Sequence, residues 1–192
     1  ALEELGLHYR LHLVDLSKGG AAVPGLQAIN PNAKIPALVE GLYDGRSAVI
    51  FESGAILLYL ADKRPGLIPT DQVARATTLS WLFLQVAGLG PSFGNTAYFL
   101  HRATMPNEAL SRFQGEALRY MSLVENRLAQ VPWLNGVSYS IADIAHFCWI
   151  RSCEYAGMKI ENYPAARAWV GRIEERDATQ VALERCYRTR VG

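Results

Sequence analysis

Two neighbouring residues have side chains that could hold a small polar ligand. Glu52 and Ser53 follow an apolar run that predicts a strand, and Ser53 begins the pattern of a helix. The first N–H groups of a helix lack partners and attract a carboxylate. Ser53 could donate to that carboxylate while Glu52 accepts from an ammonium group, so that the pair holds an amino-acid head. The alternative is that Ser53 only caps its own helix and Glu52 favours the helix dipole.

A second candidate is the pair Ile35–Pro36, in which a proline opens a predicted strand. Proline has no N–H to donate, so it belongs at the start or the edge of a strand. If the peptide bond is cis, the N–H and C=O of Ile35 turn outward and can pair with a peptide-like ligand laid along that edge. The alternative is an ordinary trans proline, the form that most X–Pro bonds take.

The cysteines and histidines predict little chemistry of their own. Cys148, Cys153 and Cys186 include no CxxC pair, so we expect no disulfide framework and favour a reducing, cytoplasmic compartment. Cys148 and Cys153 fall on an apolar helix and are predicted to be buried and inert. The four histidines show no spacing typical of a metal site, so no metal is predicted.

The composition narrows the class of protein. Of the 192 residues 50% are hydrophobic and 19% are charged, which excludes a disordered tail and a coiled coil. The formal net charge of +1 gives no general attraction to nucleic acid or to an anionic membrane surface. No apolar run of about eighteen residues predicts a membrane span. Residues 1–6 lack the basic start of a secretory signal.

The predicted secondary structure that would position these residues differs between the two parts of the chain. The first part mixes strands and helices, and its alternation over 8–13 and its Asp44–Gly45 turn predict a strand and a hairpin. The predicted elements there are a helix end at Gly6, a strand over 8–13, a loop over 17–32, antiparallel strands at Ile35–Val39 and Ala48–Phe51, and a helix from Ser53 to Arg64.

Beyond a linker at Pro65–Thr70 the pattern is helical only. The predicted helices cover 73–86, ended by Gly88 and Gly90–Pro91, then 110–128, a segment from the capping box Ser140–Asp143 to Ile150, 164–176 and 181–186. We therefore predict an α/β domain over 1–66 and an all-α domain over 71–192.

Four motifs carry a family resemblance: Asn30–Leu38 (NPNAKIPAL), Phe51–Leu60 (FESGAILLYL), Trp81–Pro91 (WLFLQVAGLGP) and Trp133–Asp143 (WLNGVSYSIAD). On these the chain resembles the glutathione transferase superfamily, and within it the bacterial nu-class proteins, which are glutathione-dependent disulfide-bond reductases. The resemblance implies a thioredoxin-like N-terminal domain, truncated at its start, and an all-α helical-bundle C-terminal domain.

The resemblance also implies roles for particular residues. Ile35–Pro36 becomes the cis junction whose main chain pairs with the cysteinyl part of glutathione, and Glu52 and Ser53 bind the γ-glutamyl head. Arg119 matches a family arginine near the ligand, where a guanidinium could pair with a carboxylate, although a solvated helix charge is the alternative. Asp143 matches a buried capping acid with a structural role.

The implied activity uses the thiolate of bound glutathione as the nucleophile toward a disulfide or an electrophile, with no metal. Disulfide reduction ranks above S-conjugation, and the alternative from another class is a binding or regulatory protein that keeps the pocket without the chemistry. In the family the thiol-activating residues lie before the segment that starts at Ala1, so no catalytic residue is assigned.

The sequence departs from the family pattern at two places, and a second copy of the chain is its expected partner. Ala21 stands where relatives carry a glutamine, and Asn95–Tyr98 replaces a more polar wall of the second pocket, which predicts a different co-substrate or a weaker hold on a second glutathione. We expect a two-fold homodimer in contact through Phe51 and the helices that start at Asp71 and Pro106.

Overall fold

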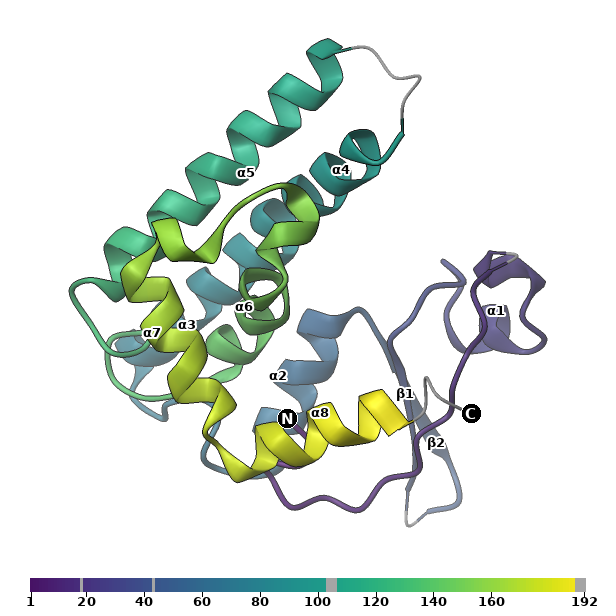
Figure 1. Cartoon of the computed structure of the whole chain (residues 1–192). Helices are drawn as coiled ribbons and strands as arrows, with labels where there is room; N and C mark the ends of the chain where they lie inside the picture. The colour runs from purple at the N-terminus through teal and green to yellow at the C-terminus, as the bar shows by residue number, and fades with distance from the viewer. Residues whose placement is uncertain (18, 43, 103–106, 189–192) are drawn as a thin grey trace.

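The computed structural model describes residues 1–17, 19–42, 44–102 and 107–188. Figure 1 shows a small α/β part beside a larger group of helices, with α6 in the middle of the helical group. Among the described residues, no helix has the length and apolar character that crossing a membrane requires.

A β-hairpin forms the centre of the α/β part. Strand β1 (Ala37–Gly41) pairs antiparallel with β2 (Ser47–Phe51), and the register sets Ala37 opposite Phe51. The Asp44 carboxylate accepts the N–H of Arg46 at 3.1 Å, and Gly45 takes a φ of 81°, which glycine tolerates without strain. The predicted hairpin is confirmed.

Short helical segments flank the hairpin: the 3₁₀ turn η1 (Gly20–Ala22), α1 (Leu26–Ile29) and α2 (Ser53–Lys63). Helix α2 packs on the hairpin and on α6, burying Leu57, Leu60 and Ala61. The Tyr59 hydroxyl donates to Glu40 of β1 at 2.7 Å, and Lys63 forms an ion pair with the same carboxylate. These bonds fix α2 against β1.

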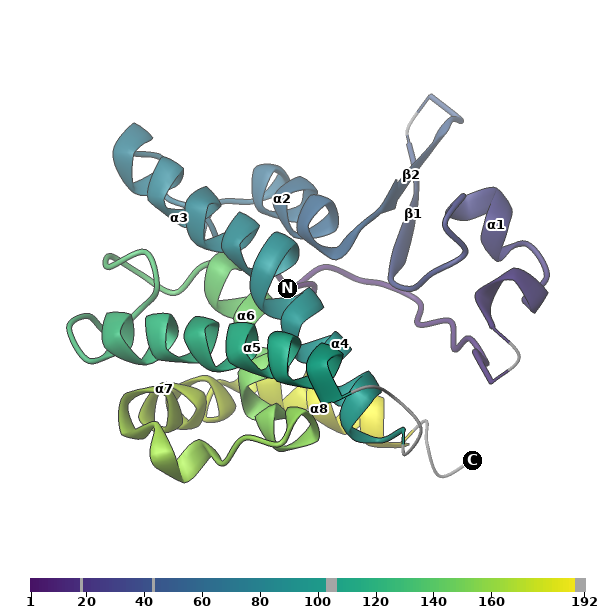
Figure 2. The same cartoon turned by 90° about the horizontal axis from the view of Figure 1, so that it is seen from above.

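The strand predicted over residues 8–13 is wrong. The segment has no strand assignment, and Figure 2 shows it as an irregular trace between the hairpin and the helices. A strand needs a neighbour to pair its main-chain groups, and no described strand lies beside this segment. Leu11 and Leu13 are consequently exposed. The turns before it do end at Gly6, which has a φ of 58°.

The helical part contains α3 (Gln72–Leu84), the π-helical turn η2 (Gln85–Leu89), α4 (Gly90–Leu100), α5 (Asn107–Leu128), α6 (Ile141–Arg151), the 3₁₀ turns η3 (Cys153–Ala156) and η4 (Ile160–Asn162), α7 (Pro164–Glu174) and α8 (Asp177–Arg188). The predicted helix stop at Gly88 and Gly90–Pro91 is wrong, because α3 continues through η2 into α4. Pro91 has no N–H to donate, and it closely follows the π turn η2, where the regular hydrogen-bond pattern of the α-helix is already interrupted.

Helix α6 begins at the capping box that the sequence predicts. The fully buried Asp143 carboxylate accepts the N–H and hydroxyl of Ser140, the N–H of Leu134 and the indole N–H of Trp169, at 2.9–3.0 Å. Burial raises the pKa of Asp143, and these donors oppose the rise. Asp143 therefore has a structural role, joining α6 to α7 and to the preceding loop.

Candidate functional site

The hairpin register brings the two sequence candidates together. Because Ala37 pairs with Phe51, the residue before β1 and the residue after β2 are neighbours at one end of the hairpin. Pro36 and Glu52 occupy these two positions. The Ile35–Pro36 peptide bond is cis, as the resemblance implied. Residues 35–36 and residues 52–53 thus lie side by side, although position 52 comes sixteen positions after position 36 in the sequence.

The main chain of Ile35 is open to a ligand. Its side chain is 51% exposed, and within the described part of the chain neither its N–H nor its C=O forms a hydrogen bond. A main-chain N–H and C=O that face outward can accept an added strand. Ile35 therefore keeps both of its main-chain groups unpaired beside the cis Pro36.

Asn30, which the sequence pattern placed in a loop without a role, holds this edge in place. The side chain is 1% exposed, its Nδ2 donates to the Lys34 carbonyl at 2.8 Å, and its Oδ1 accepts the N–H of Asn32 at 2.9 Å. Gly20 of η1 packs so closely on this loop that a Cβ there would lie 1.6 Å from the Ala33 carbonyl oxygen. The Asn30-Pro31-Asn32 turn sequence was the available signal.

Glu52 and Ser53 leave the start of α2 open. Glu52 precedes the helix with a φ of 68° and a ψ of 121°, and no side chain of the described residues caps the first turn. The simple cap that the sequence left open as the alternative is therefore not formed. Both side chains are exposed, and Ser53 makes no side-chain hydrogen bond that the structure describes. The first-turn N–H groups and the Ser53 hydroxyl are available to a carboxylate.

Arg119 lies elsewhere within the chain. On α5 its guanidinium pairs with Glu116 at 2.7 Å and stacks 4.2 Å from the centre of the Tyr120 ring. The hydrogen bond to Glu116 raises the pKa of Arg119. Half of the side chain is exposed.

The π turn η2 separates Arg119 from the start of α2. A Cβ on Gly54 would lie 3.1 Å from Val86, whereas a Cβ on Gly88 would meet the Tyr120 ring at 2.3 Å. Residues two apart on a helix point to nearly opposite sides. Helix α2 and helix α5 therefore contact opposite sides of η2, and one chain does not bring Arg119 beside Ser53.

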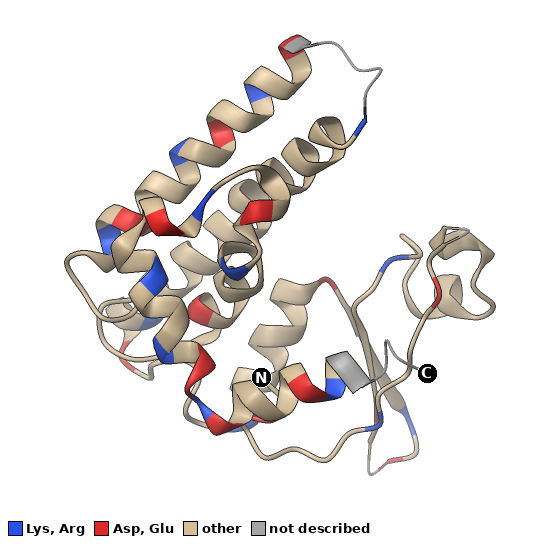
Figure 3. Cartoon of the chain, in the orientation of Figure 1, with Lys and Arg blue, Asp and Glu red and all other residues tan. Residues whose placement is uncertain are grey.

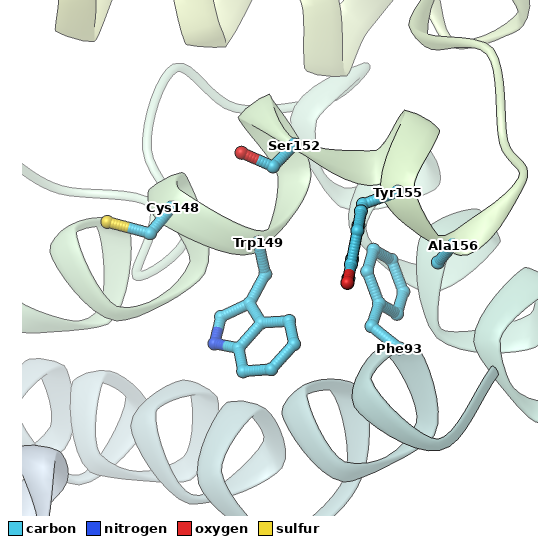
Figure 4. Close-up of a pocket in the computed structure, with 6 residues that line it drawn as sticks. All are labelled: Phe93, Cys148, Trp149, Ser152, Tyr155 and Ala156. Carbon is cyan, nitrogen blue, oxygen red and sulfur yellow. The ribbon is translucent and has the colours of Figure 1, made fainter. Parts of the chain in front are cut away.

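A cavity of about 270 Å³ lies between α4, α6 and η3. Figure 4 shows its lining, in which aromatic rings predominate: Phe93, Cys148, Trp149, Ser152, Tyr155 and Ala156. No charged side chain lines it, and α4, drawn entirely tan in Figure 3, carries no charge at all. Residues 95–98, which the sequence placed in the wall of a second pocket, do not line this cavity.

Helix α3, the turn η2 and helix α4 form one continuous helix, and the cavity lies on the same side of it as α2. The Trp149 ring lies over α4, 3.4 Å from the Cβ that Gly90 would carry and 3.6 Å from that of Gly94. Val86, the contact of Gly54, is four residues before Gly90, so these positions share one helix face about 6–12 Å apart along the axis. The cavity and the contact with α2 therefore lie on one face of this helix.

The cysteines only partly match the prediction. Cys153 lies in η3 rather than on the predicted apolar helix. It is fully buried, and burial raises the pKa of its thiol to about 11, so it is unreactive as expected. Cys148 is exposed at the cavity, which corrects the prediction that it is buried. Helix α6 is largely apolar, but the face at Cys148 and Trp149 meets the cavity rather than another helix.

The fold and the open hairpin end define the class of protein. Residues 1–63 match the model of the glutathione S-transferase N-terminal domain, and residues 91–177 match that of the C-terminal domain. The chain therefore belongs to the glutathione S-transferase family, with a thioredoxin-like N-terminal domain followed by a helical C-terminal domain.

Two curated relatives come from Escherichia coli strain K12. The chain is 45% identical over 186 residues to the disulfide-bond oxidoreductase YfcG, covering 95% of this chain and 86% of that protein. It is 35% identical over 191 residues to the disulfide-bond oxidoreductase YghU, covering 94% and 65%.

Solved structures give the same assignment. A Burkholderia graminis glutathione transferase with two glutathione molecules bound per subunit matches with a TM-score of 0.84 and 35% identity, covering 95% of this chain and 80% of that one. A Pseudomonas putida glutathione transferase with one glutathione disulfide bound per subunit matches with a TM-score of 0.85 and 32% identity, covering 95% and 83%.

Proposed function

We propose that the protein is an enzyme that reduces disulfide bonds with glutathione. The observation that carries the proposal is the hairpin register, which sets the open edge at Ile35 beside the uncapped start of α2. Two of its curated relatives are named disulfide-bond oxidoreductases, and solved relatives hold glutathione or its disulfide. Cytoplasmic location is part of this proposal, because glutathione and free thiols belong to a reducing compartment.

The binding mode follows from the groups that the site leaves unused. The N–H and C=O of Ile35 pair with the cysteinyl residue of glutathione as with an added strand. The Ser53 hydroxyl and the first N–H groups of α2 hold the γ-glutamyl carboxylate, and the Glu52 carboxylate accepts from the α-ammonium group. The cysteinyl sulfur is then fixed in place near the cavity.

The proposed reaction needs no protein cysteine. The thiolate of bound glutathione attacks one sulfur of the substrate disulfide, which forms a mixed disulfide and releases the other sulfur as a thiolate. A second glutathione thiolate attacks the glutathione sulfur of the mixed disulfide, which gives glutathione disulfide and releases the second substrate thiol. Two glutathione molecules thus supply the two electrons that reduce one disulfide.

Conjugation of glutathione to a small electrophile is the second candidate function. The observation that favours it is the uncharged aromatic cavity, which suits an apolar electrophile better than a second charged tripeptide. Turnover of chlorodinitrobenzene faster than that of 2-hydroxyethyl disulfide would establish conjugation as the main activity.

The experiment uses the purified protein with any residues that precede Ala1 in the natural chain. Reduction of 2-hydroxyethyl disulfide is followed by NADPH consumption through glutathione reductase, and glutathione binding is measured by calorimetry. We expect turnover, and Ser53→Ala to weaken glutathione binding about tenfold, since hydrogen bonds to charged groups are worth about 1.5–3 kcal/mol. Ser138→Ala, which removes an exposed serine in the loop before α6, is the control and should change neither measurement. Binding without turnover of either substrate would show a binding protein instead.

We further propose that two copies form a two-fold homodimer. Phe51 is exposed, and α3 and α5 present uncharged exposed positions: Val73, Ala76, Ser80 and Phe83 on α3, and Leu118 and Leu123 on α5. A second copy seated there would place its ligand near Arg119, which one chain does not bring to its own site. Pro106, expected in the contact, lies outside the described residues. A monomer at micromolar concentration in light scattering would contradict the dimer.

A further inference from the structure

Two exposed cysteines belong to different helices of the helical part, Cys148 to α6 and Cys186 to α8. Cys148 lines the aromatic cavity, and Figure 4 shows its sulfur at the edge of the lining, directed away from the rings of Phe93 and Tyr155. Of the three cysteines, all within the described residues, only Cys153 is buried. Cys148 and Cys186 are therefore the thiols that a reagent in solution can reach.

The thiols of Cys148 and Cys186 also lie near each other. Burial among the cavity residues raises the pKa of Cys148, Cys186 raises it further, and Arg151 lowers it. Surface charges that are separated by more than a Debye length, about 10 Å at moderate ionic strength, are largely screened from each other. The electrostatic effect of Cys186 on Cys148 therefore places the two thiols within roughly that distance, although they lie on different helices.

Helix α8 has few buried contacts that would keep the two thiols apart. Among the residues of α8 whose side chains the structure describes, only Thr179 is buried. An ion pair of 3.2 Å between Arg185 and Glu3 ties the helix to the start of the chain. Segments with few buried contacts shift at a low cost in free energy. A shift of α8 toward α6 can bring the two Cα atoms to the separation of about 4.4–6.8 Å that a disulfide requires.

We propose that Cys148 and Cys186 form a reversible disulfide when glutathione disulfide accumulates. The thiolate of one cysteine attacks glutathione disulfide, which forms a mixed disulfide and releases one glutathione thiolate. The thiolate of the other cysteine then attacks the protein sulfur of the mixed disulfide, which closes the Cys148–Cys186 bond and releases the second glutathione thiolate. The two cysteines are oxidised, one glutathione disulfide is reduced, and the two protons of the cysteines pass to the two glutathione molecules.

The disulfide links the edge of the cavity to the redox state of glutathione. Its oxidant is the product of the proposed reaction, so the inference rests on the proposed function for the source of the oxidant. The exchange itself needs no bound glutathione, because glutathione disulfide reacts with exposed thiolates directly from solution. Oxidation joins α6 to α8 and removes the Cys148 thiol from the cavity edge, and an excess of glutathione reverses both exchanges.

Peptide mass spectrometry tests the pairing. The full-length protein, Cys148→Ser, Cys186→Ser and the control Cys153→Ala are incubated with glutathione disulfide at pH 8, alkylated and digested without a reductant. We expect a peptide pair joined through Cys148 and Cys186 in the unmodified protein and in Cys153→Ala. Each serine variant should instead keep a glutathione adduct on its remaining exposed cysteine, because no second thiol displaces it. An excess of glutathione should restore both thiols of the unmodified protein.

Three results would overturn the inference. The first is a glutathione adduct on each of Cys148 and Cys186 in the unmodified protein without the joined peptides. The second is no reaction of either cysteine, and the third is a joined pair found only in covalent dimers on a non-reducing gel. Failure of the proposed function is distinguishable from these, since the protein would then neither bind glutathione nor reduce 2-hydroxyethyl disulfide, while the joined peptides still form.

Discussion

Glu52 holds a backbone conformation that L-residues rarely adopt, at the position where the proposed ligand meets α2. Its φ of 68° is strained for a residue with a Cβ, at a cost of about 1–3 kcal/mol. The conformation turns the chain from β2 into α2 while no described side chain caps the helix. The strain therefore accompanies an open helix start and an exposed carboxylate, which a glycine at this position would not supply.

Two substitutions of Glu52 separate strain from binding. Glu52→Gly and Glu52→Ala both remove the carboxylate, so both should weaken glutathione binding to the same extent. Glycine adopts a positive φ without strain, so we expect the Gly variant to have the larger free energy of unfolding, by about 1 kcal/mol. Urea unfolding measures this difference. Equal stability of the two variants would mean that Glu52 is not strained in solution.

The π turn η2 is the element on which α2 and α5 both rest. Gly54 packs on Val86 from one side, and Tyr120 packs on Gly88 from the other. The extra residue of a π turn shifts the helix register, and such turns are frequent at functional sites. Here the turn lets one continuous helix carry the start of α2, the cavity at Trp149 and the helix that bears Arg119.

Substitution of Gly88 tests this arrangement. A Cβ at Gly88 would lie 2.3 Å from the Tyr120 ring, so Gly88→Ala should lower the free energy of unfolding by about 1–3 kcal/mol. Tyr120→Leu in the same chain should recover part of the loss, because it removes the tip of the phenol ring. Gly115→Ala is the matched control, since a Cβ there meets nothing within 4 Å and alanine favours a helix. Additive losses in the double variant would disprove the contact.

Contacts between the two parts give the whole molecule one connected core. Arg176 of the helical part binds Glu4 near the start of the chain at 2.7 and 2.8 Å and stacks 4.0 Å from the centre of the Tyr139 ring. Within the α/β part, Arg64 donates to the Leu5 carbonyl at 2.8 Å. The core extends from the start of the chain through α6, where His146 is fully buried. The acid stability of the molecule should therefore depend on that histidine.

His146 predicts how unfolding depends on pH. Its Nδ1 lies 2.9 Å from the Ala142 carbonyl oxygen, its Nε2 has no partner among the described residues, and burial lowers its pKa to about 4. The unfolded chain regains a pKa near 6.5 and binds a proton that the folded protein rejects. Stability from the neutral ring is complete above about pH 6.5 and falls toward pH 4, by up to about 1.4 kcal/mol per pH unit.

Urea unfolding at several pH values between 7.5 and 4.5 checks this dependence. His146→Leu should flatten the curve of unfolding free energy against pH, whatever it does to stability at pH 7.5. An equally steep curve in this variant would place the acid sensitivity in other groups.

The sequence alone was sufficient to predict the elements that depend on interactions between residues close together in the chain. The Asp44–Gly45 turn predicted the hairpin, Ser140 and Asp143 predicted the start of α6, regular apolar spacing predicted α5, and Pro164 predicted the start of α7. Glu52, Ser53, Ile35 and Pro36 were recognised as a possible ligand-binding set, because helix starts and strand edges leave predictable groups unpaired.

Tertiary structure decided what depends on neighbours that are distant in sequence. Residues 8–13 alternate like a strand yet remain irregular without a partner, and Gly88 serves as a contact for Tyr120 instead of a helix stop. The motifs by themselves indicated the family, the Asp44–Gly45 turn predicted the hairpin, and the sequence singled out candidate ligand-binding residues beside it. Only the packed chain decided that these residues share one end of the hairpin and that Arg119 stands apart, because register and helix packing join positions that local patterns cannot relate.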